Sequence, residues 1–134
     1  MTDITRISPV ELHPTAGYAH ITITETGRTA HLAGQCPLDR DELVVGEGDL
    51  FAQIDQVVAN SLVALAAAGV GPERVVRSVI YVVSDRSEEL GAAWKHLQDG
   101  PLAPAFATAS TLLGVAALGY RGQLVEIDLT AALP

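Results

Sequence analysis

The alternation of apolar and polar residues divides the chain into short strands and helices. Residues 19–25 and 29–35 both alternate, and a turn at Thr26-Gly27 would bring their apolar side chains to one face. This pattern predicts a β-hairpin formed by the two segments. Residues 4–7 begin and end with Ile and predict a short edge strand.

A helix is expected directly after Asp49, which is a suitable N-cap residue. Apolar residues then recur at the spacing of one helical face, which holds Leu50, Ile54, Val57, Val58, Ser61, Leu62 and Leu65. Gly69 at the C′ position and Pro72 beyond it predict the end of this helix. A second helix is expected to begin at Ser84 or Asp85, with Leu90, Ala93, Trp94 and Leu97 on one face.

Residues 74–84 predict a strand that is apolar on both faces. Alternation places Val75, Val79, Tyr81 and Val83 on one side and Val76, Ile80 and Val82 on the other. Helices can cover one side, but a small domain supplies nothing obvious for the second, so this strand indicates oligomerisation. Strands are also expected at 105–117 and 123–131, and residues 110–118 and 124–131 are expected to pair as a hairpin through a turn at 119–122.

Composition narrows the class of protein. The 134 residues have the size of one domain, and we expect a single domain over residues 1–134. One cysteine and the lack of an apolar leader predict a cytoplasmic protein. The net charge of −8 argues against binding to nucleic acids or anionic membranes. No stretch is expected to reach the roughly 18 apolar residues of a membrane span.

Several segments, in order, match one family. Residues 32–39 (LAGQCPLD) are similar to a Ser-Gly-Gln-x-Pro signature, and the first predicted helix carries Gln53 and Asn60. Residues 75–82 and the tail formed by 114–118 (GVAAL) and 124–128 (LVEID) continue the match. Together these segments resemble the RidA/YjgF family over roughly residues 4–131.

The resemblance implies a chorismate-mutase-like α+β fold, with a mixed, mainly antiparallel sheet and two helices packed on one face. It also implies a homotrimer, assembled as a barrel, with small-molecule clefts between its subunits. The best-known members of the family hydrolyse enamines and imines to ketones and ammonia without a metal or other cofactor. We therefore expect a small-molecule ligand, self-association and no cofactor.

The resemblance also suggests catalytic residues. Glu126 matches the glutamate that positions the attacking water, and a carboxylate facing a cleft can polarise water. Tyr18 follows residues 14–17, where the family has its site tyrosine. Each residue has a simpler interpretation: Glu126 as a solvated residue of an alternating strand, and Tyr18 as a packing residue.

Four further positions are candidates for substrate binding. Gly34 lies where a family backbone group faces the ligand, and Cys36 lies near the presumed mouth of the cleft. Ser110 takes the place of the arginine that grips the substrate carboxylate, and Trp94 that of an asparagine. Trp94 could instead be a core residue and Cys36 an inert buried thiol. Ser110 is expected to line the cleft rather than to act as a nucleophile, because no triad spacing accompanies it.

The missing arginine matters, because serine cannot reproduce a bidentate guanidinium–carboxylate contact. Residues 105–118 contain no Lys or Arg; Arg121 could reach the cleft, but we expect it on the surface. No histidine has metal-ligand spacing, so no metal is expected. The prediction is a hydrolase or deaminase-like protein acting on an imine, enamine or related metabolite, inefficient on 2-imino acids. The alternative is a non-catalytic metabolite-binding trimer; the acidic charge argues against an endoribonuclease.

Overall fold

The computed structural model describes residues 3–25 and 27–134. Its elements follow one another as β1 (Ile4–Ile7), β2 (Ile21–Thr24), β3 (Thr29–His31), α1 (Leu50–Ala67), β4 (Val75–Val83), α2 (Ser87–Gln98), β5 (Ala109–Val115) and β6 (Val125–Ala132), with short 3-10 turns at Pro72–Arg74 and Ala103–Phe106.

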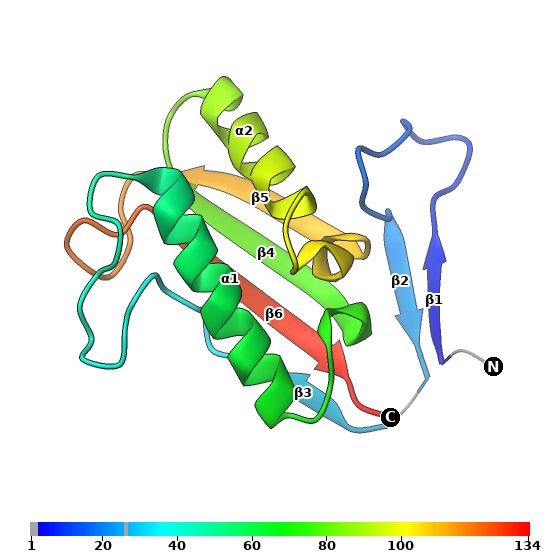
Figure 1. Ribbon diagram of the computed structural model, residues 1–134. Helices are drawn as coiled ribbons and strands as arrows, with labels where there is room; N and C mark the ends of the chain where they lie inside the picture. The colour runs from blue at the N-terminus through cyan, green and yellow to red at the C-terminus, as the bar shows by residue number, and fades with distance from the viewer. Residues whose placement is uncertain (1–2, 26) are drawn as a thin grey trace.

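The four-stranded sheet has the order β3-β6-β4-β5, in which only β4 and β5 run parallel. Both helices cover the same face of this sheet (Figure 1). The expected α+β fold, with a mixed, mainly antiparallel sheet and helices on one face, is confirmed. Strands β1 and β2 form a separate antiparallel pair beside it.

Helix α1 forms where the sequence predicts it. The Asp49 carboxylate accepts a hydrogen bond from the Ala52 amide at 3.1 Å, and Gly69 follows the helix at a φ of 85°. Helix α2 begins at Ser87, later than expected. The reason is local, because the Ser84 hydroxyl accepts a hydrogen bond from the Arg86 amide in a turn that precedes the helix.

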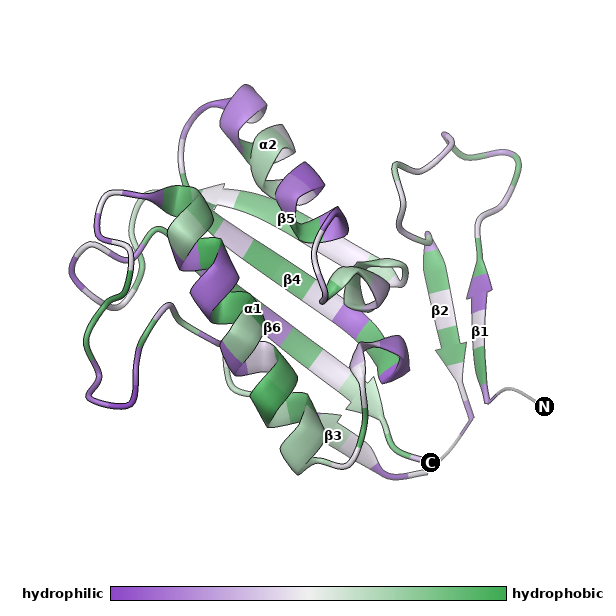
Figure 2. Cartoon of the chain, viewed as in Figure 1, coloured by the Kyte–Doolittle hydropathy of each residue, from purple (hydrophilic) through white to green (hydrophobic). Residues whose placement is uncertain are grey.

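By length and composition alone, α1 could cross a membrane, so the expectation that no segment reaches this size was wrong. The core helix of a globular protein passes the same test. One face of α1 buries Ile54, Val57 and Leu65 against the sheet. Purple, hydrophilic segments interrupt the helix in Figure 2, while apolar segments alternate along β4 and β6 behind it.

The expected hairpins were wrong. Strand β2 pairs with β1, with Ile7 opposite Ile21, and β3 pairs with β6. Thr26, in the proposed turn, lies outside the described residues. At the other end of the chain, β4 lies between β5 and β6, and β5 begins only at Ala109 after the Ala103–Phe106 turn. Alternation identifies the apolar face of a strand, but it does not identify the neighbouring strand.

Strand β4 is apolar on both faces, as the pattern predicts. Ile80 and Val82 are completely buried towards the helices, and Tyr81 is half-buried on the opposite face. The register shifts between Val75 and Arg77, so Val75 lies on the helix side with the core, not with Tyr81. Leu113 of β5, which pairs with Tyr81, is 43% exposed. The sheet therefore presents a partly apolar face away from the helices.

Candidate functional site

Glu126 lies on the sheet face that points away from the helices. Its strand neighbours Val125 and Ile127 are buried in the core, so alternation turns the carboxylate to the other side. Gln123 Nε2 donates a hydrogen bond to Glu126 Oε1 at 3.1 Å, and Cys36 Sγ donates to the same oxygen at 3.4 Å. Two donors on one oxygen fix the orientation of the carboxylate.

The second oxygen, Oε2, lies directly beside Gly34. A Cβ atom at position 34 would collide with Oε2 and come within 2.8 Å of the Glu126 Cδ. Glycine here allows the close approach of the carboxylate, because any side chain at position 34 would displace Glu126. Because both protein donors use Oε1, Oε2 is left for a water molecule or a ligand next to the Gly34 backbone.

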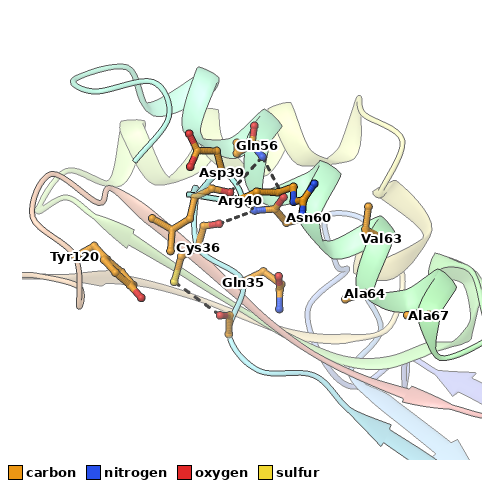
Figure 3. A pocket seen from close by; sticks show the side chains of 12 residues that line it. Gln35, Cys36, Asp39, Arg40, Gln56, Asn60, Val63, Ala64, Ala67 and Tyr120 are labelled. Carbon is orange, nitrogen blue, oxygen red and sulfur yellow. Dashed lines mark hydrogen bonds between the residues drawn. The ribbon is translucent and has the colours of Figure 1, made fainter. Parts of the chain in front are cut away.

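The segment that carries Gly34 and Cys36 is fixed on both sides. Gln35 exchanges backbone hydrogen bonds with Ile127 of β6, at 2.7 and 3.1 Å. On the other side, Asn60 Nδ2 of α1 donates to the carbonyl oxygens of Cys36 and Leu38, at 3.0 and 2.9 Å (Figure 3). A groove of about 790 Å³ runs between this segment and the exposed side of α1. Helix α1 thus positions the glycine against the carboxylate.

The surroundings of the Cys36 thiol favour its protonated form. Burial, the Glu126 charge and the hydrogen bond to Glu126 together raise the Cys36 pKa from 9.0 to about 11. The protonated thiol can donate to Glu126, whereas a thiolate could not. The interpretation of Cys36 as an inert thiol is therefore the better one, with the added role of holding Oε1. We call Gly34, Cys36, Gln123 and Glu126 the carboxylate site.

Tyr18, Trp94 and Ser110 come together in a different place. They line a pocket of about 300 Å³ between β5, α2 and residues 16–18, which we call the aromatic pocket; its lining is completed by Ala16, Gly91 and Leu112. Trp94 Nε1 donates to the Ala16 carbonyl oxygen at 2.8 Å. The Ser110 hydroxyl is hydrogen-bonded to Ser78 at 2.6 Å. No lining residue carries a charge, so this pocket suits an uncharged group.

Residues on the chain before β2 hold Tyr18 in the aromatic pocket. His13 Nε2 and the Tyr18 hydroxyl are 2.8 Å apart, and the Tyr18 ring packs edge-on against Trp94 at 6.2 Å between centroids. The ring of His20 packs edge-on against His13, at 4.6 Å. His20 directly precedes β2 and His31 lies in β3, so these two histidines belong to different sheets.

The predicted site residues thus form two separate groups within one chain. Ser110 pairs with the buried Ser78 and faces the helices from the β5 edge of the sheet. Gly34 lies in the segment that continues β3 alongside β6, and Glu126 faces away from the helices. Strands β5 and β6 are two positions apart, or about 10 Å, and their site residues point to opposite faces. A small molecule bound to one group therefore cannot touch the other in the same chain.

Sequence reasoning missed Gln123 and His13. Gln123 is only 3% exposed and stands three positions before Glu126, at the start of the alternating strand, where an apolar residue would be ordinary. A polar residue at such a position is the signal that could have found it. No rule of residue spacing could have identified His13 as part of the pocket. Arg121 is exposed in the turn, and residues 3–25 and 27–134 hold no cluster of His, Cys, Asp or Glu suited to a metal.

This fold, with a glycine-backed carboxylate on one sheet face and an aromatic pocket behind the opposite edge, defines a class of small α+β proteins. The chain belongs to the RidA/YjgF family: the family model described as Endoribonuclease L-PSP matches residues 8–133. It is 33% identical to Protein DfrA of Myxococcus xanthus over 116 residues, covering 85% of this chain and 83% of that protein.

Solved structures of family members have the same fold. The Rid-family protein YyfB of Yersinia pestis is 34% identical, with a TM-score of 0.87 over 98% of this chain and 100% of its own. Rv2704 of Mycobacterium tuberculosis, described as a member of the YjgF/YER057c/UK114 family, is 27% identical with a TM-score of 0.60 over 97% and 99% of the two chains. These likenesses support a family-level function on small molecules.

Proposed function

We propose that this chain forms a homotrimer in which the carboxylate site of one subunit faces the aromatic pocket of the next. The separation of the two groups within one chain supports this arrangement. The half-buried apolar sheet face around Tyr81 and Leu113 supports self-association. Each cleft would then combine a water-holding carboxylate with an uncharged pocket.

The proposed reaction is hydrolysis of an imine, or of the imine tautomer of an enamine, to a carbonyl compound and ammonia. A water held by Glu126 Oε2 attacks the imine carbon as its proton passes to that oxygen. The imine nitrogen receives the C=N electron pair and takes the proton from Glu126, which gives a carbinolamine. The observation that carries this proposal is the carboxylate whose Oε1 is fixed by Gln123 and Cys36 and whose Oε2 is open beside Gly34.

The substrate is expected to be less acidic than a 2-imino acid. Ser110 stands where the family has the carboxylate-binding arginine, and it is bonded to Ser78 within an uncharged pocket. Neutral imines should therefore be hydrolysed with a higher kcat/KM than 2-imino acids, measured as ammonia release. Glu126→Gln should lower kcat by about 100-fold. Glu88→Gln, the same chemical change at an exposed position of α2, should leave kcat unchanged.

Subunit mixing tests the shared cleft. Gly91 lines the aromatic pocket, and a Cβ there meets open space, so Gly91→Phe should fill the pocket without a backbone clash. Co-refolding equal amounts of Glu126→Gln and Gly91→Phe subunits should restore about a quarter of wild-type activity, because a quarter of random interfaces combine two intact halves. If both halves belonged to one subunit, mixing would restore none.

The alternative is a metabolite-binding trimer without catalysis. The neutral character of the aromatic pocket favours it, because binding there needs no reacting group. A ligand that binds only the folded protein must raise its melting temperature. A wild-type protein that hydrolyses no imine, yet shows such a shift that Gly91→Phe abolishes, would establish the alternative and contradict the enzyme.

A further inference from the structure

The Tyr18 hydroxyl has a basic neighbour that the reaction described above does not use. His13 Nε2 lies 2.8 Å from this oxygen, and His20 Nε2 donates to the His13 carbonyl oxygen at 2.9 Å. The edge-on packing of the two imidazole rings, at 81° between planes, fixes the orientation of His13. The Tyr18 ring lines the aromatic pocket, so the contact joins an exposed imidazole to a pocket phenol.

The hydrogen-bonding capacity of these groups sets the direction of the contact. A phenol oxygen carries one proton and can also accept hydrogen bonds. When His13 Nε2 is protonated, it donates to the Tyr18 oxygen, and the phenolic proton is free to point at a ligand. When Nε2 is unprotonated, Tyr18 donates to it, and that proton is withdrawn from the pocket.

Hydrolysis of an imine needs an acid that protonates the departing nitrogen. In the aromatic pocket, Trp94 Nε1 already donates to Ala16, and the Ser110 hydroxyl is bonded to Ser78. The other lining residues, Ala16, Gly91 and Leu112, have no acidic side chain. Tyr18 is thus the lining side chain best suited to give a proton, and His13 is placed to replace it.

We propose that His13 is a positioning residue and proton carrier for Tyr18, an inference that rests on the proposed imine hydrolysis. The hydroxyl group of the carbinolamine gives its proton to Glu126 as the carbonyl double bond forms. The C–N electron pair leaves with the nitrogen, which takes the proton of Tyr18. The Tyr18 oxygen then takes a proton from Nε2 of the His13 imidazolium, which becomes a neutral imidazole. Ammonia and the carbonyl compound leave, and Glu126 and His13 exchange protons with water.

The test compares His13→Ala, His13→Gln and Tyr18→Phe on a neutral imine, with His31→Ala as the control for an exposed histidine outside the pocket. Both His13 variants should lose about 100-fold in kcat with little change in KM. Gln can still donate a hydrogen bond to Tyr18 but has no proton to transfer. The Tyr18→Phe, His13→Ala double variant should be no slower than Tyr18→Phe alone.

Added imidazole separates proton transfer from a structural role. Free imidazole should raise the rate of His13→Ala but not that of Tyr18→Phe. A wild-type rate in His13→Gln, or a slow His13→Ala that imidazole leaves unchanged, would overturn the proton-carrier role while the loss of activity in Glu126→Gln still upholds hydrolysis. A wild-type protein without imine hydrolysis would overturn both proposals.

Discussion

At the scale of single residues, the contacts of Glu126 decide what the site can do. Gln123 and Cys36 donate to one carboxylate oxygen, and Gly34 leaves room beside the other. The same contact acts on the thiol, since a nearby negative charge and an acceptor both favour the protonated form of Cys36. The rate at which the Cys36 thiol reacts therefore depends on the charge and the hydrogen bond of Glu126, and it can be used to detect this contact.

Cys36 is expected to react slowly with iodoacetamide at pH 8, because its pKa of about 11 leaves little thiolate. Glu126→Gln removes the charge and the carboxylate acceptor but leaves burial, which is the largest cause of the raised pKa. Alkylation should accelerate by up to about tenfold, the effect of one pKa unit on the thiolate population. Glu88→Gln, at an exposed position of α2, should leave the rate unchanged. Equal rates in Glu126→Gln and wild type would contradict the assigned contact.

At the scale of elements, the β1–β2 pair is joined to the main sheet by a few specific contacts. Arg74 forms a bidentate ion pair with Asp3, at 2.8 and 2.7 Å, directly before β1. Arg6 Nη2 also donates to the Val75 carbonyl oxygen at 2.9 Å. Because β2 leads from the residues around Tyr18, these contacts help to hold the aromatic pocket in place.

The ion pair predicts a pH dependence of stability. The Arg74 guanidinium lowers the Asp3 pKa from 3.8 to about 2, so folding favours the ionised carboxylate. This contribution is complete above the unfolded pKa of 3.8 and is lost as the pH falls through about 2. Asp3→Asn should lower the melting temperature at pH 7, and the difference from wild type should shrink below pH 3.8 and vanish below pH 2.

Asp85→Asn provides the control for that series, because Asp85 is exposed in the connection between β4 and α2. Its melting temperature should follow that of the wild type at every pH. A difference between Asp3→Asn and wild type that persists unchanged to pH 2 would contradict the role assigned to the ion pair.

At the scale of the whole molecule, the sheet has one face covered by helices and one face that is half-buried in a single chain. Val79 and Tyr81 of β4 lie on the second face. On the neighbouring strand β6, Asp128 lies opposite Val79 and Glu126 lies opposite Tyr81. A strand that is apolar on both sides is stable when a second layer covers it. The proposed trimer supplies that layer and brings the two halves of the cleft together.

Leu113→Lys is expected to convert the trimer to a monomer, because it places a charge beside Tyr81 on the apolar part of the proposed interface. Val63→Lys is the matched control, since Val63 is 71% exposed on α1, on the other side of the molecule. Light scattering after size-exclusion chromatography should give three times the chain mass for wild type and Val63→Lys, and one chain mass for Leu113→Lys. A monomeric wild type would contradict the assembly.

The sequence by itself determined those helices and strands whose caps and periodicity lie within the element itself. Asp49 and Gly69 delimit α1, and the alternation along β6 places Val125 and Ile127 in the core, because caps and periodicity act over a few residues. The family resemblance, carried by residues 32–39 and 124–128 among others, also predicted the fold and made Glu126 a candidate. These features need no knowledge of which segments are neighbours in space.

Only the tertiary structure decided which strands pair and which side chains form hydrogen bonds with one another. Alternation in β2 and β5 is equally compatible with pairing to β3 and β6, and the observed pairings depend on contacts between distant segments. The same is true of Gln123 and Cys36 on one oxygen of Glu126, and of His13 on Tyr18. Hydrogen bonds of this kind depend on the direction of side chains after folding, which the pattern along a chain does not encode.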